Sequence, residues 1–227
     1  MGAAGIARSR RLPWVLAALG IGAVLVALLL AIGFAAGRWP FGWDEAIVRG
    51  LRAWGGPGWL RRGAVDLTAL GGGTVLTLAV VAAAGLMLVR RLPLTAGTVV
   101  LAAASGNLVV DLVKGQVARA RPAVVPHLVE VSNYSFPSGH AANSAIVWLT
   151  LAALAGQVTP AAAARTYLLV AAALLVGAIG ASRVYLGVHW PSDVLAGWSF
   201  GTLWALGWWW VLERTRRRVG GERGSSG

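Results

Sequence analysis

The sequence predicts an all-α, polytopic membrane protein with six transmembrane helices and a short interfacial helix between the first two. Three observations predict this fold class. The chain of 227 residues is 57% hydrophobic and only 12% charged, about half the charged fraction of a typical soluble domain. Its mean hydropathy is +0.70. Several apolar runs reach the roughly 20 residues that a helix needs to span a bilayer.

The composition also excludes several classes of protein. The chain contains no cysteine, so disulfides, zinc–thiolate sites and thiol catalysis are excluded. Its formal charge of +12 invites a nucleic-acid interpretation. The arginines, however, lie mostly in loops and tails beside apolar runs, which is the pattern that membrane topology produces. We therefore expect no nucleic-acid partner.

The first predicted transmembrane helix runs from Trp14 to Ala36, after a basic tail of residues 1–13. A basic tail followed by an apolar run is also typical of a signal peptide. This run carries no charge, however, and is far longer than a signal-peptide core of roughly 7–15 residues. We therefore predict that it is retained as the first span, with the tail in the cytoplasm.

A polar segment, Arg38–Arg62, separates the first span from the second. Within it Ile47, Leu51 and Trp54 recur at helical spacing, while charged residues face the other way. This pattern, with Asp44 as the cap, predicts a short helix that lies in the membrane interface.

Five further apolar runs predict the remaining spans, which form one domain with the first, residues 14–212. The run Gly71, Gly72 and Gly73 in the second span allows close packing or a bend. After the sixth span comes a basic tail, residues 213–227, which we expect to be disordered. The five spans cover Leu67–Val89, Leu94–Val113, Ser138–Gly156, Tyr167–Ala181 and Val194–Leu212.

An even number of spans places both chain ends on the same face of the membrane. If that face is cytoplasmic, it carries eleven of the twenty lysines and arginines, and the opposite face carries nine. Cytoplasmic loops are the more basic ones in membrane proteins, so this small excess predicts cytoplasmic termini in a plasma or inner membrane. The connections after the third and fifth spans then lie on the outer or periplasmic face.

Three polar clusters meet on that outer face, because successive helices alternate in direction. One closes the third span, one opens the fourth, and one joins the fifth to the sixth. A lysine, three arginines and two histidines in one place describe a pocket for a phosphate group. The clusters consist of Lys114, Arg119 and Arg121; of Pro137, Ser138, Gly139 and His140; and of Arg183, His189 and Asp193.

These residue types suit attack on phosphorus. Ser138 is a natural helix cap, and the free N–H groups of a helix start form an anion site that Gly139 leaves open to close approach. Asp193, in the first turn of the last helix, can hold one ring nitrogen of His189 and leave the other nucleophilic. A second histidine, His140, can protonate the leaving oxygen.

The clusters resemble the three ordered signature motifs of the type 2 phosphatidic acid phosphatase superfamily, and all three match without substitution. The six-helix frame is also similar to the membrane branch of that family. In this sequence the motifs are Lys114-x6-Arg121-Pro122, Pro137-Ser138-Gly139-His140 and Ser182-Arg183-x5-His189-x3-Asp193.

The resemblance implies a role for each motif residue. His189 would be the nucleophile that forms a phosphohistidine, Asp193 would orient it, and His140 would be the general acid. The family uses no metal, so no cofactor is implied, and the cations of the site would supply the charge stabilisation. The groups implied to bind the phosphoryl oxygens are Lys114, Arg121, Arg183, Ser138 and the N–H of Gly139.

Three further polar residues are not motif positions. Arg119 is a candidate auxiliary phosphate ligand, with contact to solvent or lipid headgroups as an equal alternative. Asn107 and Asp111 lie within the third span, where they are costly unless they face protein or a wet cavity. We expect Asn107 to make a helix–helix hydrogen bond and Asp111 to pair with Lys114, one turn away.

The resemblance therefore implies an integral membrane lipid phosphatase, whose partners are a lipid phosphate substrate and the membrane. The expected reaction is metal-independent hydrolysis of a phosphomonoester or pyrophosphate headgroup. Undecaprenyl pyrophosphate is the leading expected substrate, and phosphatidylglycerophosphate, phosphatidate and diacylglycerol pyrophosphate are the alternatives. A lipid transporter or scramblase is the alternative of a different class, but such a protein does not need two histidines and an aspartate at these spacings.

Overall fold

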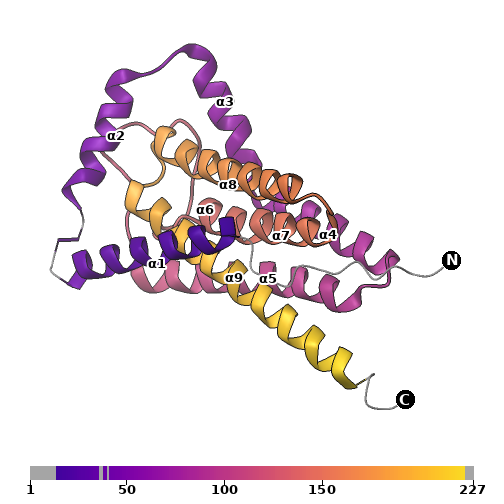
Figure 1. Ribbon diagram of the computed structural model, residues 1–227. Helices are drawn as coiled ribbons and strands as arrows, with labels where there is room; N and C mark the ends of the chain where they lie inside the picture. Colours follow the sequence, from indigo (N-terminus) through magenta and orange to yellow (C-terminus); the bar gives the residue numbers. More distant parts are fainter. Residues whose placement is uncertain (1–13, 36–37, 40, 223–227) are drawn as a thin grey trace.

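The computed structural model describes residues 14–35, 38–39 and 41–222 (Figure 1). Over these residues the chain is helical and contains no β-strand, as the sequence predicts. Pro93 and Pro191 begin two of the helices, at the position where a missing N–H is tolerated. The elements are α1 (Trp14–Ala35), α2 (Gly42–Trp54), α3 (Gly58–Ala69), α4 (Gly73–Val89), α5 (Pro93–Val117), α6 (Gly139–Ser144), the π-helical turn η1 (Ala145–Leu149), α7 (Thr150–Val158), α8 (Ala162–Tyr185) and α9 (Pro191–Glu222).

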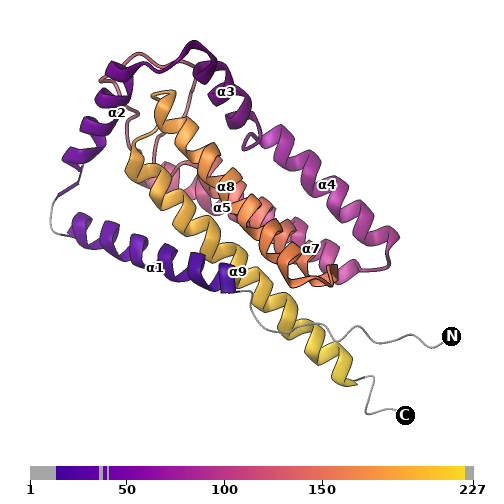
Figure 2. The ribbon, with the colours of Figure 1, turned by 45° about the horizontal axis from the view of Figure 1, so that its top comes forward.

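The long helix α9 runs the length of the bundle, and α1 packs along it (Figures 1 and 2). α6, η1 and α7 form one continuous stretch that contacts both α8 and α9. In Figure 2 the connection from α8 to α9 lies at the upper left with α2, whereas α4 and α5 are joined at the lower right. The bundle thus has two distinct ends, and α2 covers the one where the polar clusters are predicted.

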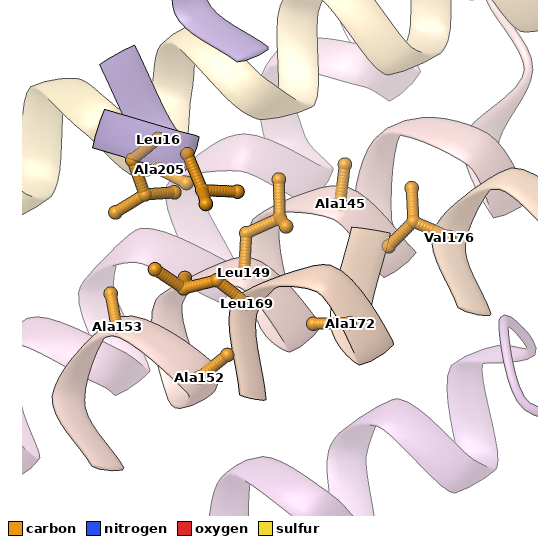
Figure 3. Packing of buried hydrophobic residues seen from close by; sticks show 10 residues of the cluster. Leu16, Ala145, Leu149, Ala152, Ala153, Leu169, Ala172, Val176 and Ala205 are labelled. Carbon is orange, nitrogen blue, oxygen red and sulfur yellow. The ribbon is translucent and has the colours of Figure 1, made fainter. Parts of the chain in front are cut away.

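The core lies between α1, η1, α7, α8 and α9 (Figure 3). Leu16, Leu149 and Leu169 converge there and are almost fully buried. Small residues on the facing helices allow close approach, which is how helices associate in lipid. α9 approaches α6 closely, because a Cβ atom added at Gly201 would clash with the carbonyl oxygen of Ala142, and one added at Gly197 would lie only 2.7 Å from the carbonyl oxygen of Ser138.

The predicted second span consists of two helices, α3 and α4, which are bent by 46° relative to each other. The break falls at residues 70–72, in the glycine run that allowed a bend. There the carbonyl of Leu70 accepts a hydrogen bond from Nε1 of Trp148 at 3.2 Å. A Cβ atom at Gly71 would lie 2.5 Å from Cγ2 of Ile179, so glycine is needed for this bend to pack against α8.

The helix predicted between the first two spans is present as α2, but one of its faces was assigned wrongly. Ile47 and Trp54 are exposed, in agreement with the predicted apolar face. Asp44, predicted to cap the helix on its wet side, is 1% exposed, and Phe41 is the N-cap residue instead. The reason is that Asp44 binds an arginine of a distant segment, as described below. The position of α2 in the membrane interface stays a prediction.

Several helices are long and apolar enough to cross a membrane, which confirms the membrane character of the protein. Four helical stretches meet this criterion among the described residues, namely α1, α5, the stretch Gly139–Val158 and α8. The bent pair α3–α4 adds a fifth if it forms one span. The count of six stays a prediction, with α9 as the remaining candidate.

The last helix extends further than predicted. α9 continues to Glu222, past Leu212, where the sixth span was expected to end and a disordered tail to begin. Arg216 explains part of the difference, since its guanidinium donates hydrogen bonds to Gln157 and Thr95, each at 2.7 Å. The expectation of disorder is therefore corrected for residues 213–222, whereas the tails 1–13 and 223–227 lie outside the described residues.

Candidate active site

The α8–α9 connection holds a histidine against a carboxylate. His189 and Asp193 are 2% and 0% exposed, and Nδ1 of His189 lies 3.4 Å from Oδ2 of Asp193. The same oxygen accepts a hydrogen bond from the backbone N–H of Trp190 at 2.9 Å. This is the reciprocal half of a capping box, in which an acidic residue in the first turn binds the N–H that precedes the helix. The start of α9 therefore fixes the carboxylate beneath the ring.

The other ring nitrogen faces a cation. Nη1 of Arg121 lies 3.2 Å from Nε2 of His189 and also donates to the carbonyl of Val188 at 2.6 Å. Because a guanidinium can only donate, Nε2 carries the lone pair and Nδ1 the proton. Burial lowers the pKa of His189 to about 4, although the Asp193 carboxylate acts in the opposite direction. The imidazole is therefore neutral near pH 7, as a nitrogen nucleophile must be.

Two predicted phosphate ligands, Lys114 and Arg183, are buried at the same end of the bundle, and Arg121 is half-buried beside them. Lys114 is held by the carbonyl of Tyr134, to which Nζ donates at 2.9 Å, and lies close enough to Arg121 and Arg183 to interact with their charges. Arg183 donates to Oγ1 of Thr68 at 2.9 Å. Such a concentration of positive charge requires an anion to offset it.

Two buried polar atoms in this cluster have no hydrogen-bond partner within the described chain, namely Oγ of Ser138 and Nε of Arg183. A hydroxyl and a guanidinium N–H are both donors, and an oxyanion is the ligand that would satisfy them. Gly139, the first residue of α6, has only Lys114 and Val110 near the position of a Cβ atom. No backbone atom therefore crowds the start of α6 on the side where a Cβ atom would lie, and anion binding there stays a prediction.

His140 follows in the first turn of α6 and interacts electrostatically with Arg183 and His189. Ser138, the N-cap residue of α6, donates its backbone N–H to the carbonyl of Asp193 at 3.0 Å. This backbone contact ties the start of α6 to the start of α9. All eight residues predicted to act in catalysis or to bind phosphate are thus brought to one end of the bundle.

Two residues beside Asp193 form a support that the sequence did not predict in full. Oγ of Ser135 donates to Oδ2 of Asp193, and Nη1 of Arg119 donates to Oδ1 at 2.5 Å. Arg119 is 9% exposed and stacks on Trp39, with its guanidinium carbon 4.0 Å from the ring centroid. Arg119 therefore faces the carboxylate, and we assign it a positioning role in place of the predicted auxiliary phosphate contact.

Asp44 completes this support from α2. Its Oδ2 accepts a hydrogen bond from Nη2 of Arg119 at 2.8 Å, and its Oδ1 accepts the backbone N–H of Ser192 at 2.8 Å. Asp44, Arg119 and Asp193 thus form a carboxylate–guanidinium–carboxylate row. Sequence reasoning missed Asp44 because its partners lie more than 70 residues away, and the available signal was only an acidic residue in an amphipathic helix.

The predictions for two polar residues of α5, Asn107 and Asp111, have different outcomes. Asn107 makes the predicted helix–helix hydrogen bond, since Nδ2 of Asn143 on α6 donates to its Oδ1 at 2.8 Å. Asp111 was predicted to pair with Lys114, and this was wrong. Its Oδ2 accepts from Nδ2 of Asn107 at 3.0 Å, while Lys114 turns to Tyr134.

Comparison with known families and sequences gives consistent results. The model of the PAP2 superfamily matches residues 95–217. Phosphatidylglycerophosphatase B of Bacillus subtilis (strain 168) is 33% identical over 162 residues, which are 70% of this chain and 78% of that protein. An undecaprenyl-diphosphatase of Sulfolobus acidocaldarius is 37% identical over 71 residues, 31% of this chain and 30% of that protein.

Two solved structures are similar to this one. The transmembrane PAP2 type phosphatidylglycerolphosphate phosphatase of Bacillus subtilis aligns with a TM-score of 0.73 and 28% identity, over 87% of this chain and 97% of that one. Aquifex aeolicus LpxE aligns with a TM-score of 0.56 and 22% identity, over 74% and 96% of the two chains, which is a likeness of fold alone.

Proposed function

Since this chain belongs to the PAP2 superfamily of membrane lipid phosphatases, we propose that it acts through a phosphohistidine formed on His189. The observation that carries the proposal is the pair of contacts on the imidazole, with Asp193 on Nδ1 and Arg121 on Nε2. Nε2 attacks phosphorus, and the bond from phosphorus to the leaving oxygen breaks. His140 gives that oxygen a proton. Water then attacks the phosphohistidine, which releases phosphate and restores both histidines.

The cations of the site stabilise the charge of the transferring group. Lys114, Arg121 and Arg183 surround it, and Oγ of Ser138 and the N–H of Gly139 donate to its oxygens. Fixed donors aimed at developing charge are the largest contribution in many phosphoryl-transfer sites. Because protein groups supply this charge, we propose that the enzyme is independent of metal ions.

A phosphatidylglycerol phosphate is the substrate that we propose first. The support is the 33% identity of Bacillus subtilis phosphatidylglycerophosphatase B over 70% of this chain. Undecaprenyl pyrophosphate, the leading expectation from the resemblance, is the second candidate. Its support is the shorter match to an undecaprenyl-diphosphatase, which covers 31% of the chain.

Release of phosphate by the purified protein from each of the two lipids tests both the activity and the substrate. We expect higher kcat/KM on phosphatidylglycerol phosphate, undiminished activity in excess EDTA, and inhibition by vanadate, which mimics pentacoordinate phosphorus. Faster turnover of undecaprenyl pyrophosphate would reverse the order of the two substrates. Loss of activity in EDTA that one divalent ion restores would contradict the metal-independent mechanism.

We also propose that α9 is the sixth span, that both termini are cytoplasmic and that the site opens to the outer face. The chain has no cysteine, so single cysteines report topology without background. Glu130→Cys lies in the connection near the site, and Arg165→Cys lies at the start of α8, at the opposite end. An impermeant thiol reagent should label the first in intact cells and the second only after permeabilisation. The reverse result would place the site on the cytoplasmic face.

A further inference from the structure

A row of polar side chains crosses from α5 to α6 within the part of the protein that spans the membrane. Oδ2 of Asp111 accepts a hydrogen bond from Nδ2 of Asn107, and Oδ1 of Asn107 accepts one from Nδ2 of Asn143. Asp111 and Asn107 are exposed on a predicted span. Polar groups in such a position are costly, and an ionisable one points to a function.

The carboxylate fixes the direction of every hydrogen bond in this row. An ionised Asp111 can only accept, so Asn107 must turn its amide nitrogen toward Asp111 and its oxygen toward Asn143. Asn143 must in turn present its own nitrogen to Asn107. The row therefore ends in an acceptor, Oδ1 of Asn143, which is buried and has no hydrogen-bond partner within the described chain. A buried acceptor without a donor is costly, and a ligand that brings a donor would remove this cost.

The side chain that carries this acceptor lines a groove next to the catalytic end of α6. The groove has a volume of about 490 Å³ and lies between α4, α5 and the α6–η1 stretch, with Asn107 and Asn143 in its lining. The rest of the lining is mostly apolar and includes Leu76, Val80 and Val100. An apolar groove with a polar side is complementary to a lipid, whose chain is apolar and whose headgroup is polar.

The role proposed for His140 indicates which part of the substrate meets the acceptor. Asn143 follows His140 by three residues on α6, so the two side chains lie on one face, about 5 Å apart along the axis. His140 protonates the leaving oxygen and therefore lies on the leaving-group side of the phosphorus. Asn143 is one turn further in the same direction, where the carbon skeleton of the leaving group continues.

We propose that Oδ1 of Asn143 accepts a hydrogen bond from a substrate hydroxyl while a lipid chain lies in the groove. This hydroxyl is on the carbon adjacent to the one that bears the phosphate ester. The inference rests on the proposed lipid phosphatase activity and concerns its substrate class. A glycerol phosphate headgroup, as in phosphatidylglycerol phosphate, carries this hydroxyl. Phosphatidate has an esterified oxygen at the corresponding carbon, and a polyprenyl pyrophosphate has hydrocarbon there, so neither offers a donor. Asn143 is thus a residue that selects a hydroxyl-bearing headgroup, and Asp111 and Asn107 position it.

The test compares two substrates that differ only in this hydroxyl. One is phosphatidylglycerol phosphate, and the other has the same acyl chains but 1,3-propanediol in place of the headgroup glycerol. We expect the parent enzyme to prefer the first by about tenfold in kcat/KM, since a site built to bind a hydroxyl rejects an analogue without it. Asn143→Leu should abolish the preference. Asp111→Asn, which lets Asn107 and Asn143 reverse their amides, should reduce it.

Ser105→Ala is the matched control, because Ser105 lies two residues before Asn107 on α5 but its hydroxyl donates to the carbonyl of Leu101 in its own helix. It should keep the preference of the parent. Equal turnover of the two lipids by the parent enzyme would overturn the inference and leave the phosphatase assignment intact. Turnover of neither lipid would overturn the inference together with phosphatidylglycerol phosphate as the substrate, and release of phosphate from undecaprenyl pyrophosphate would then decide the phosphatase assignment. The comparison in the parent protein needs no variant, so a misfolded Asn143→Leu would not remove the test.

Discussion

Replacing His189 by alanine is expected to abolish covalent labelling of the protein and to lower turnover by at least about 10⁴-fold, the scale seen when a catalytic nucleophile is removed. In the parent enzyme, brief reaction with a lipid labelled in its terminal phosphate should leave label on the protein. A phosphohistidine is labile in acid and stable in base, so the stability of the label identifies the bond. The reason is geometric, since Nε2 of His189 is the ring nitrogen held toward the cations.

His140→Ala provides the matched comparison, because the two histidines have different tasks. A general acid is needed only when the leaving group is a poor one. His140→Ala should therefore lose much of its activity on an alkyl phosphate and regain part of it on p-nitrophenyl phosphate, whereas His189→Ala should be inactive on both. Two results would contradict the assignment of His189 as the nucleophile. One is label that persists on the His189→Ala protein, and the other is activity of His189→Ala on p-nitrophenyl phosphate.

Arg119→Lys is expected to lower kcat by about 100-fold with a smaller change in KM. The guanidinium binds Asp44 and Asp193 at once and stacks on Trp39. A lysine has a single ammonium, which cannot reproduce the two-sided geometry or the planar stacking. The bound carboxylate of Asp193 would then hold the His189 ring less firmly. Steady-state kinetics on one lipid phosphate, with the melting temperature measured in parallel, separates the loss of rate from a loss of folded protein.

Asp44→Asn should show the same pattern as Arg119→Lys, since it removes the other end of the row. Breaking a buried ion pair by removing one partner costs about 3–5 kcal/mol of stability, so a lower melting temperature is expected as well. Glu45→Gln is the control, because Glu45 is the next residue of α2 and its carboxylate accepts a hydrogen bond from Arg49, in an exposed pair at 2.7 Å. If Arg119 were instead a phosphate ligand, Arg119→Lys would mainly raise KM, and Asp44→Asn would leave kcat unchanged.

The parts of the site that the sequence predicts are those governed by local structure. The proline at the start of α9 places Asp193 in the first turn, and Asp193 then binds the N–H before the helix and the ring of His189. Because successive helices alternate in direction, the three motifs lie at one end of the bundle. This shared location can be predicted from the order of the helices, without knowing how they pack. Roles that arise locally in this way can be derived from residue types and spacing.

The features that the sequence does not predict depend on contacts between distant segments. Asp44 and Ser192 are 148 residues apart, and no spacing rule connects them. The break between α3 and α4 is marked by glycines, but no spacing rule predicts that Trp148 donates a hydrogen bond to the carbonyl of Leu70 there. Past its apolar part, helix α9 is held in part by Arg216, which donates hydrogen bonds to residues of α5 and α7. In each case a polar group is satisfied by a partner that only the tertiary fold supplies.

The buried Asp44 also bears on how this catalytic unit can be divided or recombined. The region that matches the family begins at residue 95, whereas Asp44 belongs to α2, well before it. A fragment limited to the matching region would leave the guanidinium of Arg119 with one carboxylate in place of two, in a position that water hardly reaches. Chimeras between relatives should therefore exchange α2 together with the segment around Arg119. The amino-terminal third therefore contributes to the active site, and a chimera that receives the motifs without it would be an incomplete enzyme.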